Sequence, residues 1–223
     1  IAAIHDKRIQ ILQKAGLYMR KIIICNVTMK ESVIPLVYES DDKSLCISQQ
    51  PVTYPIFSCL NGLLSADDSV KIVLLCKCDP NGNYLRNIER FRKEFSERCG
   101  SVVPDPEYRI LNTEFDEDKA ETERLLSMLV AECEDGTEII SDTTYGSKTM
   151  SVVLLAALMF AVKHLACKVQ YVFYGQVYFQ NETPTNPRLC NLSYLIYLNS
   201  LLHTLQCDTP DKARKALDVL LKF

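Results

Sequence analysis

The chain has 223 residues, a length that fits one large domain or one domain with short appendages. Its 25 lysines and arginines stand against 28 aspartates and glutamates, and the net charge of −3 excludes a globally basic protein that binds nucleic acid by counterion release. Hydrophobic residues make up 48% and charged residues 24%, which are globular values that argue against a disordered chain.

The predicted elements begin with a short helix or linker over residues 1–18, where apolar side chains recur near helical spacing until Gly16. The chain opens at Ile1 rather than Met, so we expect further sequence upstream. Strands are predicted from apolar runs, the first two of them continuous and typical of strands buried on both faces. These strands are 21–27, 70–77, 108–113, 138–141 and 169–179.

Helices are predicted where apolar residues recur at helical spacing or where an apolar run is long. They are 55–64, 84–99, 118–134, 150–166, 192–205 and 212–221. Segments 33–38 and 45–48 flank the polar turn 40–43, which predicts a small hairpin. The alternation of strands and helices therefore predicts an α/β fold. We expect a Rossmann-like, doubly wound, mainly parallel sheet with helices on both faces, a small hairpin insertion and C-terminal helices.

Cysteines, histidines and the apolar runs limit the chemistry and the location of the protein. Ten cysteines are scattered without any Cys-x-x-Cys pair, which favours reduced thiols in the core of a cytoplasmic protein over a disulfide framework. Three histidines are too few for a convincing zinc site, so we expect no metal. The longest apolar run, 152–162, is shorter than the roughly 20 residues that span a bilayer. We therefore expect no membrane span.

Two polar turns follow buried strands, at the edge where ligands bind in such sheets. The first is 26–30; the second, 142–149, lies between a strand and an apolar helix. Gly146 permits close approach to a ligand, and hydroxyls and amides at a helix start, together with Lys148, fit a phosphate. The same residues also fit an ordinary helix cap by Ser147 or Thr149, and composition alone favours that cap.

Other motifs are weaker. Residue 141 is Ser and Gly146 stands alone, so neither a Walker A loop nor a dinucleotide turn is present. Asn26 and Thr28 fit a ribose or phosphate, but they also fit the satisfaction of a strand end. The acidic run 116–118 fits a metal less well than a helix start. Four aromatic residues on one strand fit either a stacking platform for bases or ordinary sheet packing, and these are Tyr171, Tyr174, Tyr178 and Phe179.

The motifs C-N-V-T-M-K-E (25–31) and D-T-T-Y-G-S-K-T-M (142–150), with Y-G-Q at 174–176, resemble the CRISPR-associated Rossmann fold (CARF) sensor domain of type III CRISPR systems. The resemblance covers about residues 19–207. It implies a homodimer that binds the second messenger cyclic oligoadenylate across its two-fold axis, with cyclic tetra-adenylate favoured and no other cofactor. The positions that it implies for ligand binding are Asn26, Val27, Thr28, Thr144, Tyr145, Gly146, Ser147 and Lys148.

The resemblance also implies a domain organisation: a sensor domain over 19–207 and a C-terminal helix or linker over 208–223. An effector module, upstream or downstream of this chain, would respond to the ligand in antiviral defence. Three hypotheses remain: this sensor, a stand-alone metal-independent ring nuclease, and an unrelated α/β nucleotide-binding domain. Many relatives have Thr-His-Gly where this chain has Thr-Tyr-Gly. Ring cleavage would then depend on an in-line ribose 2′-OH, with Lys148 stabilising charge.

Overall fold

The structure is a computed structural model that describes residues 20–114 and 116–222, so the helix expected over 1–18 lies outside the described residues. Six strands form one sheet in the order β3-β2-β1-β4-β5-β6. The first five strands are parallel and β6 runs antiparallel to β5. Their bounds are β1 Arg20–Asn26, β2 Ser69–Lys77, β3 Glu107–Thr113, β4 Glu138–Asp142, β5 Lys168–Gln180 and β6 Thr183–Asn191.

The central strands are apolar throughout because both faces of the sheet are covered. Alternate residues of β1 point to opposite faces: Ile23 packs into one core with Ile72 of β2, and Ile24 packs into the other with Val73. The continuous apolar runs of the sequence therefore mark the centre of the sheet.

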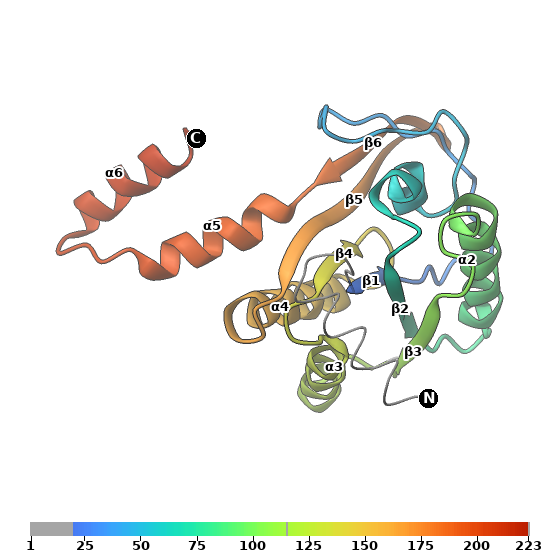
Figure 1. Cartoon of the computed structure of the whole chain (residues 1–223), viewed down its shortest axis with the longest axis horizontal. Coiled ribbons are helices and arrows are strands. Elements are labelled where there is room, and N and C mark those ends of the chain that lie inside the picture. Colours follow the sequence, from blue (N-terminus) through green and yellow to red (C-terminus); the bar gives the residue numbers. More distant parts are fainter. Residues whose placement is uncertain (1–19, 115, 223) are drawn as a thin grey trace.

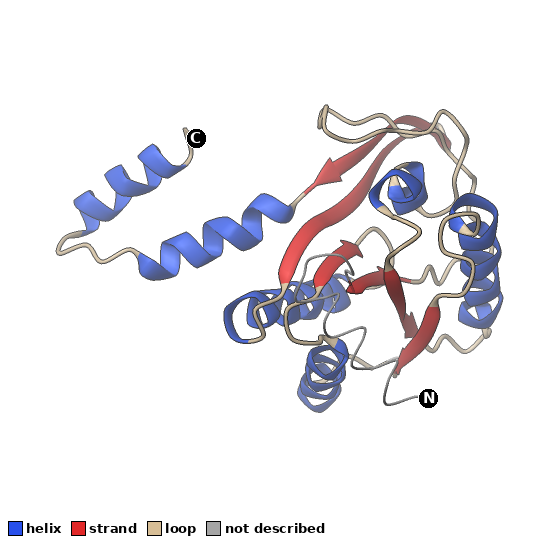
Figure 2. Ribbon diagram, viewed as in Figure 1, coloured by secondary structure: helices blue, strands red, loops and turns tan. Residues whose placement is uncertain are grey.

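The helices lie on both sides of the sheet, as Figures 1 and 2 show, and the predicted doubly wound α/β fold is confirmed. Helix α2 and the short 3-10 helices η1 and η2 cover one face, whereas α3 and α4 cover the other. The bounds are η1 Pro55–Ser58, η2 Leu60–Leu63, α2 Asn83–Cys99, α3 Lys119–Glu132, α4 Lys148–His164, α5 Ser193–Thr204 and α6 Pro210–Leu220.

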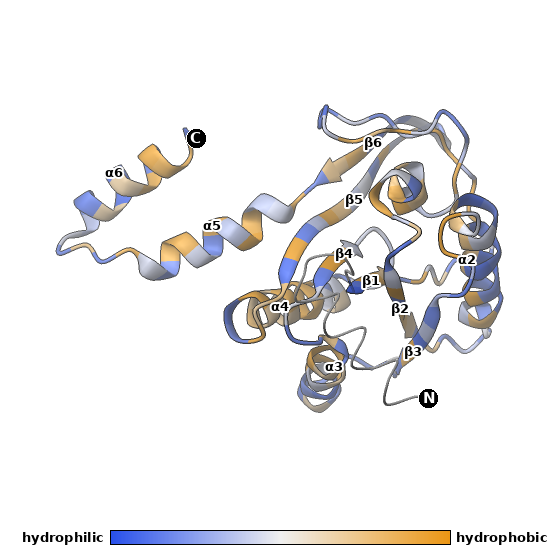
Figure 3. Cartoon of the chain, in the orientation of Figure 1, coloured by the Kyte–Doolittle hydropathy of each residue, from blue (hydrophilic) through white to orange (hydrophobic). Residues whose placement is uncertain are grey.

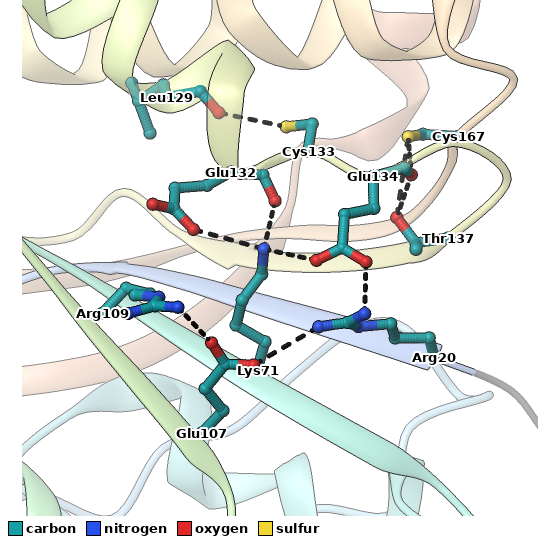
Figure 4. Close-up of polar contacts among 10 residues, drawn as sticks. All are labelled: Arg20, Lys71, Glu107, Arg109, Leu129, Glu132, Cys133, Glu134, Thr137 and Cys167. Carbon is teal, nitrogen blue, oxygen red and sulfur yellow. Dashed lines mark hydrogen bonds and ion pairs between the residues drawn. The ribbon is translucent and has the colours of Figure 1, made fainter. Parts of the chain in front are cut away.

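Ion pairs close the amino ends of the strands, the edge opposite to the two polar turns (Figure 4). Lys71 is buried there and its Nζ donates to the Glu132 carbonyl at 2.6 Å and to Glu134 Oε1 at 2.8 Å. Arg20 pairs with Glu134 and with Glu107. Because each charge has a partner, this edge joins β1, β2 and β3 to the end of α3.

One expectation about the connections is wrong, and one strand is additional to those expected. The described residues 33–48 contain no hairpin; this segment makes single bridges, Leu36 with Val52 and Glu39 with Arg188. Strand β6 was not predicted, because its prolines and asparagines disfavour strands. It forms as an edge strand, where proline is tolerated, and Asn181 and Glu182 with positive φ make the two-residue turn from β5.

The C-terminal helices project from the sheet as an arm (Figure 1), and Figure 3 shows apolar positions along both of them. Ile196 of α5 is buried, and the Tyr197 hydroxyl donates to the Val169 carbonyl at 2.7 Å. Within the described chain, α6 has no buried residue. None of the described helices combines the length and the apolar character that crossing a membrane requires. All ten cysteines lie within the described residues and are free thiols.

Candidate ligand-binding site

The two polar turns meet at the carboxyl ends of β1 and β4, which are neighbours in the sheet. Asn26 Nδ2 donates to the Tyr145 carbonyl at 2.8 Å and so links the first turn to the second. Gly146 has φ +81°, and a Cβ there would lie 3.3 Å from the Asn26 side chain. The lack of a side chain at Gly146 therefore permits the close approach of the two turns.

A cavity of about 440 Å³ opens over these turns. Four of the eight residues in the sequence-based site line it: Thr28, Thr144, Tyr145 and Gly146. The remaining walls come from the segment after β1 and from the β5–β6 hairpin. These wall residues are Met29, Lys30, Ser32, Val33, Ile34, Leu36, Tyr38, Tyr174, Gly175, Val177, Phe179 and Pro184.

The walls of this cavity are mainly apolar, and its polar groups are mostly hydroxyls and backbone atoms. Lys30 is the charged side chain among the described lining residues. Ile34 and Phe179 are more than half exposed, at 61% and 63%, although they line the cavity. A cavity with apolar walls and a few convergent polar groups suits a flat, partly polar molecule such as a nucleobase.

Thr144 and Gly175 join the second turn to β5. The Gly175 amide donates to Thr144 Oγ1 at 2.8 Å, and the Thr144 amide donates to Asp142 Oδ1 at 2.8 Å. A Cβ on Gly175 would lie 2.4 Å from Pro55 Cγ and 3.2 Å from Thr144 Cγ2. The glycine of Y-G-Q therefore permits close packing within the protein, besides lining the cavity.

Tyr145 lines the cavity, and its hydroxyl is hydrogen-bonded within the protein. The hydroxyl donates to the Thr53 carbonyl at 2.7 Å, and the ring meets Tyr54 edge-on with centroids 5.4 Å apart. Burial, reinforced by Tyr38 and Asp142, raises the pKa of the Tyr145 phenol well above its usual value. The phenol therefore stays neutral at physiological pH and is a poor general base.

Asp142 is a buried anchor of the site that sequence reasoning missed. Its Oδ2 accepts from the Ile56 amide at 3.0 Å, which fixes η1 beside the second turn. Burial raises its pKa, against the opposing effect of the hydrogen bonds from Thr144 and Ile56. Asp142 is the first residue of the motif 142–150, but the residues themselves marked it only as an aspartate at the end of an apolar strand, a place where turn-forming residues are common.

Burial and a hydrogen bond from α2 fix the position of the first turn. Asn26, Val27 and Thr28 are each 1% exposed, and the Thr28 carbonyl accepts from Asn87 Nδ2 at 2.7 Å. Thr28 Oγ1 accepts from the Lys30 amide at 3.2 Å. Asn26 Oδ1 is buried and has no hydrogen-bond partner among the described residues. Asn26 and Val27 thus support the cavity floor rather than line it.

Ser147 and Lys148 lie at the start of α4, outside the set of described residues that line the cavity. Ser147 Oγ accepts from the Met150 amide at 3.2 Å, so Ser147 is the N-cap that the sequence allowed. Lys148, the first residue of α4, is exposed.

Two residues of the acidic run 116–118, Glu117 and Asp118, have partners within the protein. Asp118 Oδ1 accepts from the Glu121 amide at 2.8 Å and caps α3, as favoured over a metal site from the sequence. Glu117 Oε1 lies 2.5 Å from Lys77 Nζ. Among the described residues, no group of three or more His, Cys, Asp or Glu side chains is arranged to hold a metal ion.

Of the aromatic residues on β5 considered from the sequence, some pack within the sheet and others line the cavity. Tyr171 stacks on Phe173 with ring centroids 5.1 Å apart, which is packing within the sheet. Tyr174 and Phe179 line the cavity, whereas the Tyr178 hydroxyl accepts from Gln176 Nε2 at 3.1 Å.

Comparison with known proteins finds a solved structure but no sequence relative. No family model matches the chain, and no curated protein matches it. The structure of Can2 from Sulfobacillus thermosulfidooxidans in complex with cyclic tetra-adenylate is 18% identical, with a TM-score of 0.35. The match covers 91% of this chain and 46% of Can2, so the chain spans about half the length of that protein. At this level of likeness, the fold assignment depends on the strand order described above.

Proposed function

We propose that this chain is a sensor domain of the CARF type that binds cyclic oligoadenylate, with cyclic tetra-adenylate as the favoured ring. The observation that carries the proposal is the single cavity formed by both motif turns, over the carboxyl ends of β1 and β4. In a doubly wound sheet this edge is where ligands bind. The motifs that resemble the family therefore lie together at the expected edge of the sheet.

The cavity offers separate places for the parts of such a ligand. Its apolar walls suit adenine, and the hydroxyls of Thr28 and Thr144 lie among its lining groups. Lys30 and exposed Lys148 supply positive charge near the turns for phosphates. Asn26 and Val27 act as positioning residues, because they hold the first turn against the second.

The proposed assembly is a homodimer with the ring across its two-fold axis, because a ring with two-fold symmetry matches an interface that uses the same surface on both copies. Each copy would contribute its Thr28, Thr144, Gly146 and Lys148. Residues 19–207 would form the sensor, and 208–223 would lead to an effector module outside this chain. Binding would favour one arrangement of the dimer, and thereby one state of the effector.

The test is calorimetry of the purified chain with cyclic tetra-adenylate and cyclic hexa-adenylate, with linear tetra-adenylate as the control. We expect tight binding of one ring per two chains and weaker binding of the linear form. Chromatography of the same mixtures after incubation should show intact rings, since the Tyr145 hydroxyl is engaged with Thr53. A linear product would instead indicate a ring nuclease. The absence of heat with either ring would contradict the proposal and favour an unrelated nucleotide-binding domain.

A further inference from the structure

Large apolar side chains stay exposed chiefly on the two segments that wall the cavity. Among the described residues before α5, most of the exposed ones belong to the segment after β1 or to β5, and these are Ile34, Val37, Tyr174, Tyr178 and Phe179. Ile34, Tyr174 and Phe179 also line the cavity. Exposed apolar side chains that are scattered singly need no explanation, but a group of them at a cavity marks a ligand-binding surface.

Tyr174 and Phe179 lie on the same wall of the cavity, because both belong to β5. Tyr174 is beside the second polar turn, since the amide of the next residue, Gly175, donates to Thr144 Oγ1 at 2.8 Å. Phe179 is near the hairpin turn, where it pairs with Pro184, another lining residue. A strand rises about 3.3 Å per residue, so the two aromatic residues are roughly 16 Å apart along the wall. A single base is too short to cover both.

The two aromatic side chains have no polar or aromatic partner in the part of the chain that the structure describes. Tyr171, by contrast, stacks on Phe173, and the Tyr178 hydroxyl accepts from Gln176. An open aromatic face at a cavity wall can stack on a nucleobase, and this stacking accepts any base because every base has a π face. The hydroxyls and the lysine of the cavity come from the two polar turns and the segment after them, not from this wall.

We infer that the β5 wall is a platform for nucleobases, on which Tyr174 stacks on one base and Phe179 on another. This inference deepens the proposed function and rests on it for the identity of the ligand. Cyclic tetra-adenylate has four adenines, and a two-fold axis through the ring gives each copy of the chain two of them. Two separate aromatic faces on one wall match that number. The sugars and phosphates are then held by the turns.

The first test is calorimetry with cyclic tetra-adenylate. Tyr174→Leu and Phe179→Leu keep an apolar side chain and remove the aromatic face; the two side chains are 41% and 63% exposed, so the variants should fold. Each should weaken binding by at least about fivefold, and the losses should multiply in the double variant, because the residues are far apart. Tyr174→Phe should recover the affinity that Tyr174→Leu loses. Tyr178→Leu is the matched control, since Tyr178 is 54% exposed on the same strand and outside the described lining of the cavity.

The second test needs no ring. Tyrosine-labelled protein is titrated by NMR with adenosine 5′-monophosphate, and with ribose 5-phosphate as the control that has no base. The Tyr174 resonance is assigned by its absence in Tyr174→Leu. A base stacked on the ring should shift this resonance upfield through its ring current, whereas ribose 5-phosphate should leave it in place.

The two measurements separate this inference from the proposed function. A wild type that does not bind cyclic tetra-adenylate but shows the shift with adenosine 5′-monophosphate alone would contradict the ring and support the platform. Equal ring affinity of Tyr174→Leu, Phe179→Leu and Tyr178→Leu would overturn the platform while leaving the ring in place. A Tyr174 resonance that adenosine 5′-monophosphate does not move would also overturn the platform.

Discussion

At the scale of single residues, Ser147 and Lys148 are neighbours with separable roles. Ser147 caps α4, whereas Lys148 is exposed and is proposed to face a ring phosphate. Lys148→Ala should lower ring affinity by about 10²- to 10⁴-fold, because the dimer loses two charge-assisted contacts of roughly 1.5–3 kcal/mol each. Its stability should barely change. Ser147→Ala should instead lose about 1 kcal/mol of unfolding free energy.

The matched control for this prediction is Lys163→Ala, at the opposite end of the same helix, where Lys163 is likewise exposed. Calorimetry with cyclic tetra-adenylate gives the affinities, and urea denaturation gives the stabilities. Equal affinity of Lys148→Ala and Lys163→Ala would remove Lys148 from the proposed site. The salt dependence of binding should also flatten in Lys148→Ala, since the lost contact is electrostatic.

At the scale of elements, the ion pair of Glu117 with Lys77 connects the segment before α3 with the end of β2, and this connection depends on pH. The pKa of Glu117 is lowered from 4.5 to about 2 in the folded protein. Its contribution to stability is therefore complete above about pH 4.5 and is lost as the pH falls toward 2. Wild type should exceed Glu117→Gln in unfolding free energy at pH 6, and the difference should shrink as the pH is lowered.

The measurement is urea denaturation of both proteins between pH 6 and pH 2.5. Other carboxylates titrate in the same range, but they do so in both proteins, so the difference isolates Glu117. Glu123→Gln provides a second reference, because Glu123 is exposed on α3. A difference between wild type and Glu117→Gln that stays constant with pH would show that the carboxylate contributes through packing rather than charge.

At the scale of the whole molecule, the arm made by α5 and α6 exposes apolar side chains. Leu201 and Leu202 of α5 are 49% and 40% exposed, and Val219 of α6 is 55% exposed. Short helices gain most of their stability from packing an apolar face, so an uncovered arm of this kind favours a partner. This agrees with the homodimer that the sequence predicts, with residues 192–205 covering the sheet or joining the interface.

Light scattering at micromolar concentration should therefore give the mass of a dimer. Leu201→Glu should shift the protein toward the monomer, because a buried charge at an interface is costly. Leu85→Glu is the matched control, since Leu85 is 57% exposed on α2, which covers the other face of the sheet. A monomeric wild type, with and without cyclic tetra-adenylate, would contradict the homodimer.

The sequence was sufficient for the elements whose stability is local or whose burial is complete. Apolar runs such as 70–77 and the amphipathic pattern of 84–99 predict β2 and α2 because burial on fixed faces imposes a period on the chain. The two turns were also predictable as a pair, since the carboxyl ends of parallel strands meet at one edge. The Ser147 cap follows from hydrogen bonds between residues three apart.

Other features depended on contacts between distant residues. Strand β6 contradicts local propensity at Pro184 and Pro187, and it forms because β5 provides hydrogen-bond partners along its length. The outer walls of the cavity include Ile34 and Phe179, which are far apart in sequence and come together only when the sheet has formed. Glu117 pairs with Lys77 across a sequence separation of 40 residues. The composition of 142–149 fits both an anion site and an ordinary helix cap, and by itself it favours the cap. Only the tertiary structure decides which of these residues line the cavity, because the sheet and α4 orient the turn: Tyr145 and Gly146 line it, whereas Ser147 starts α4 outside it.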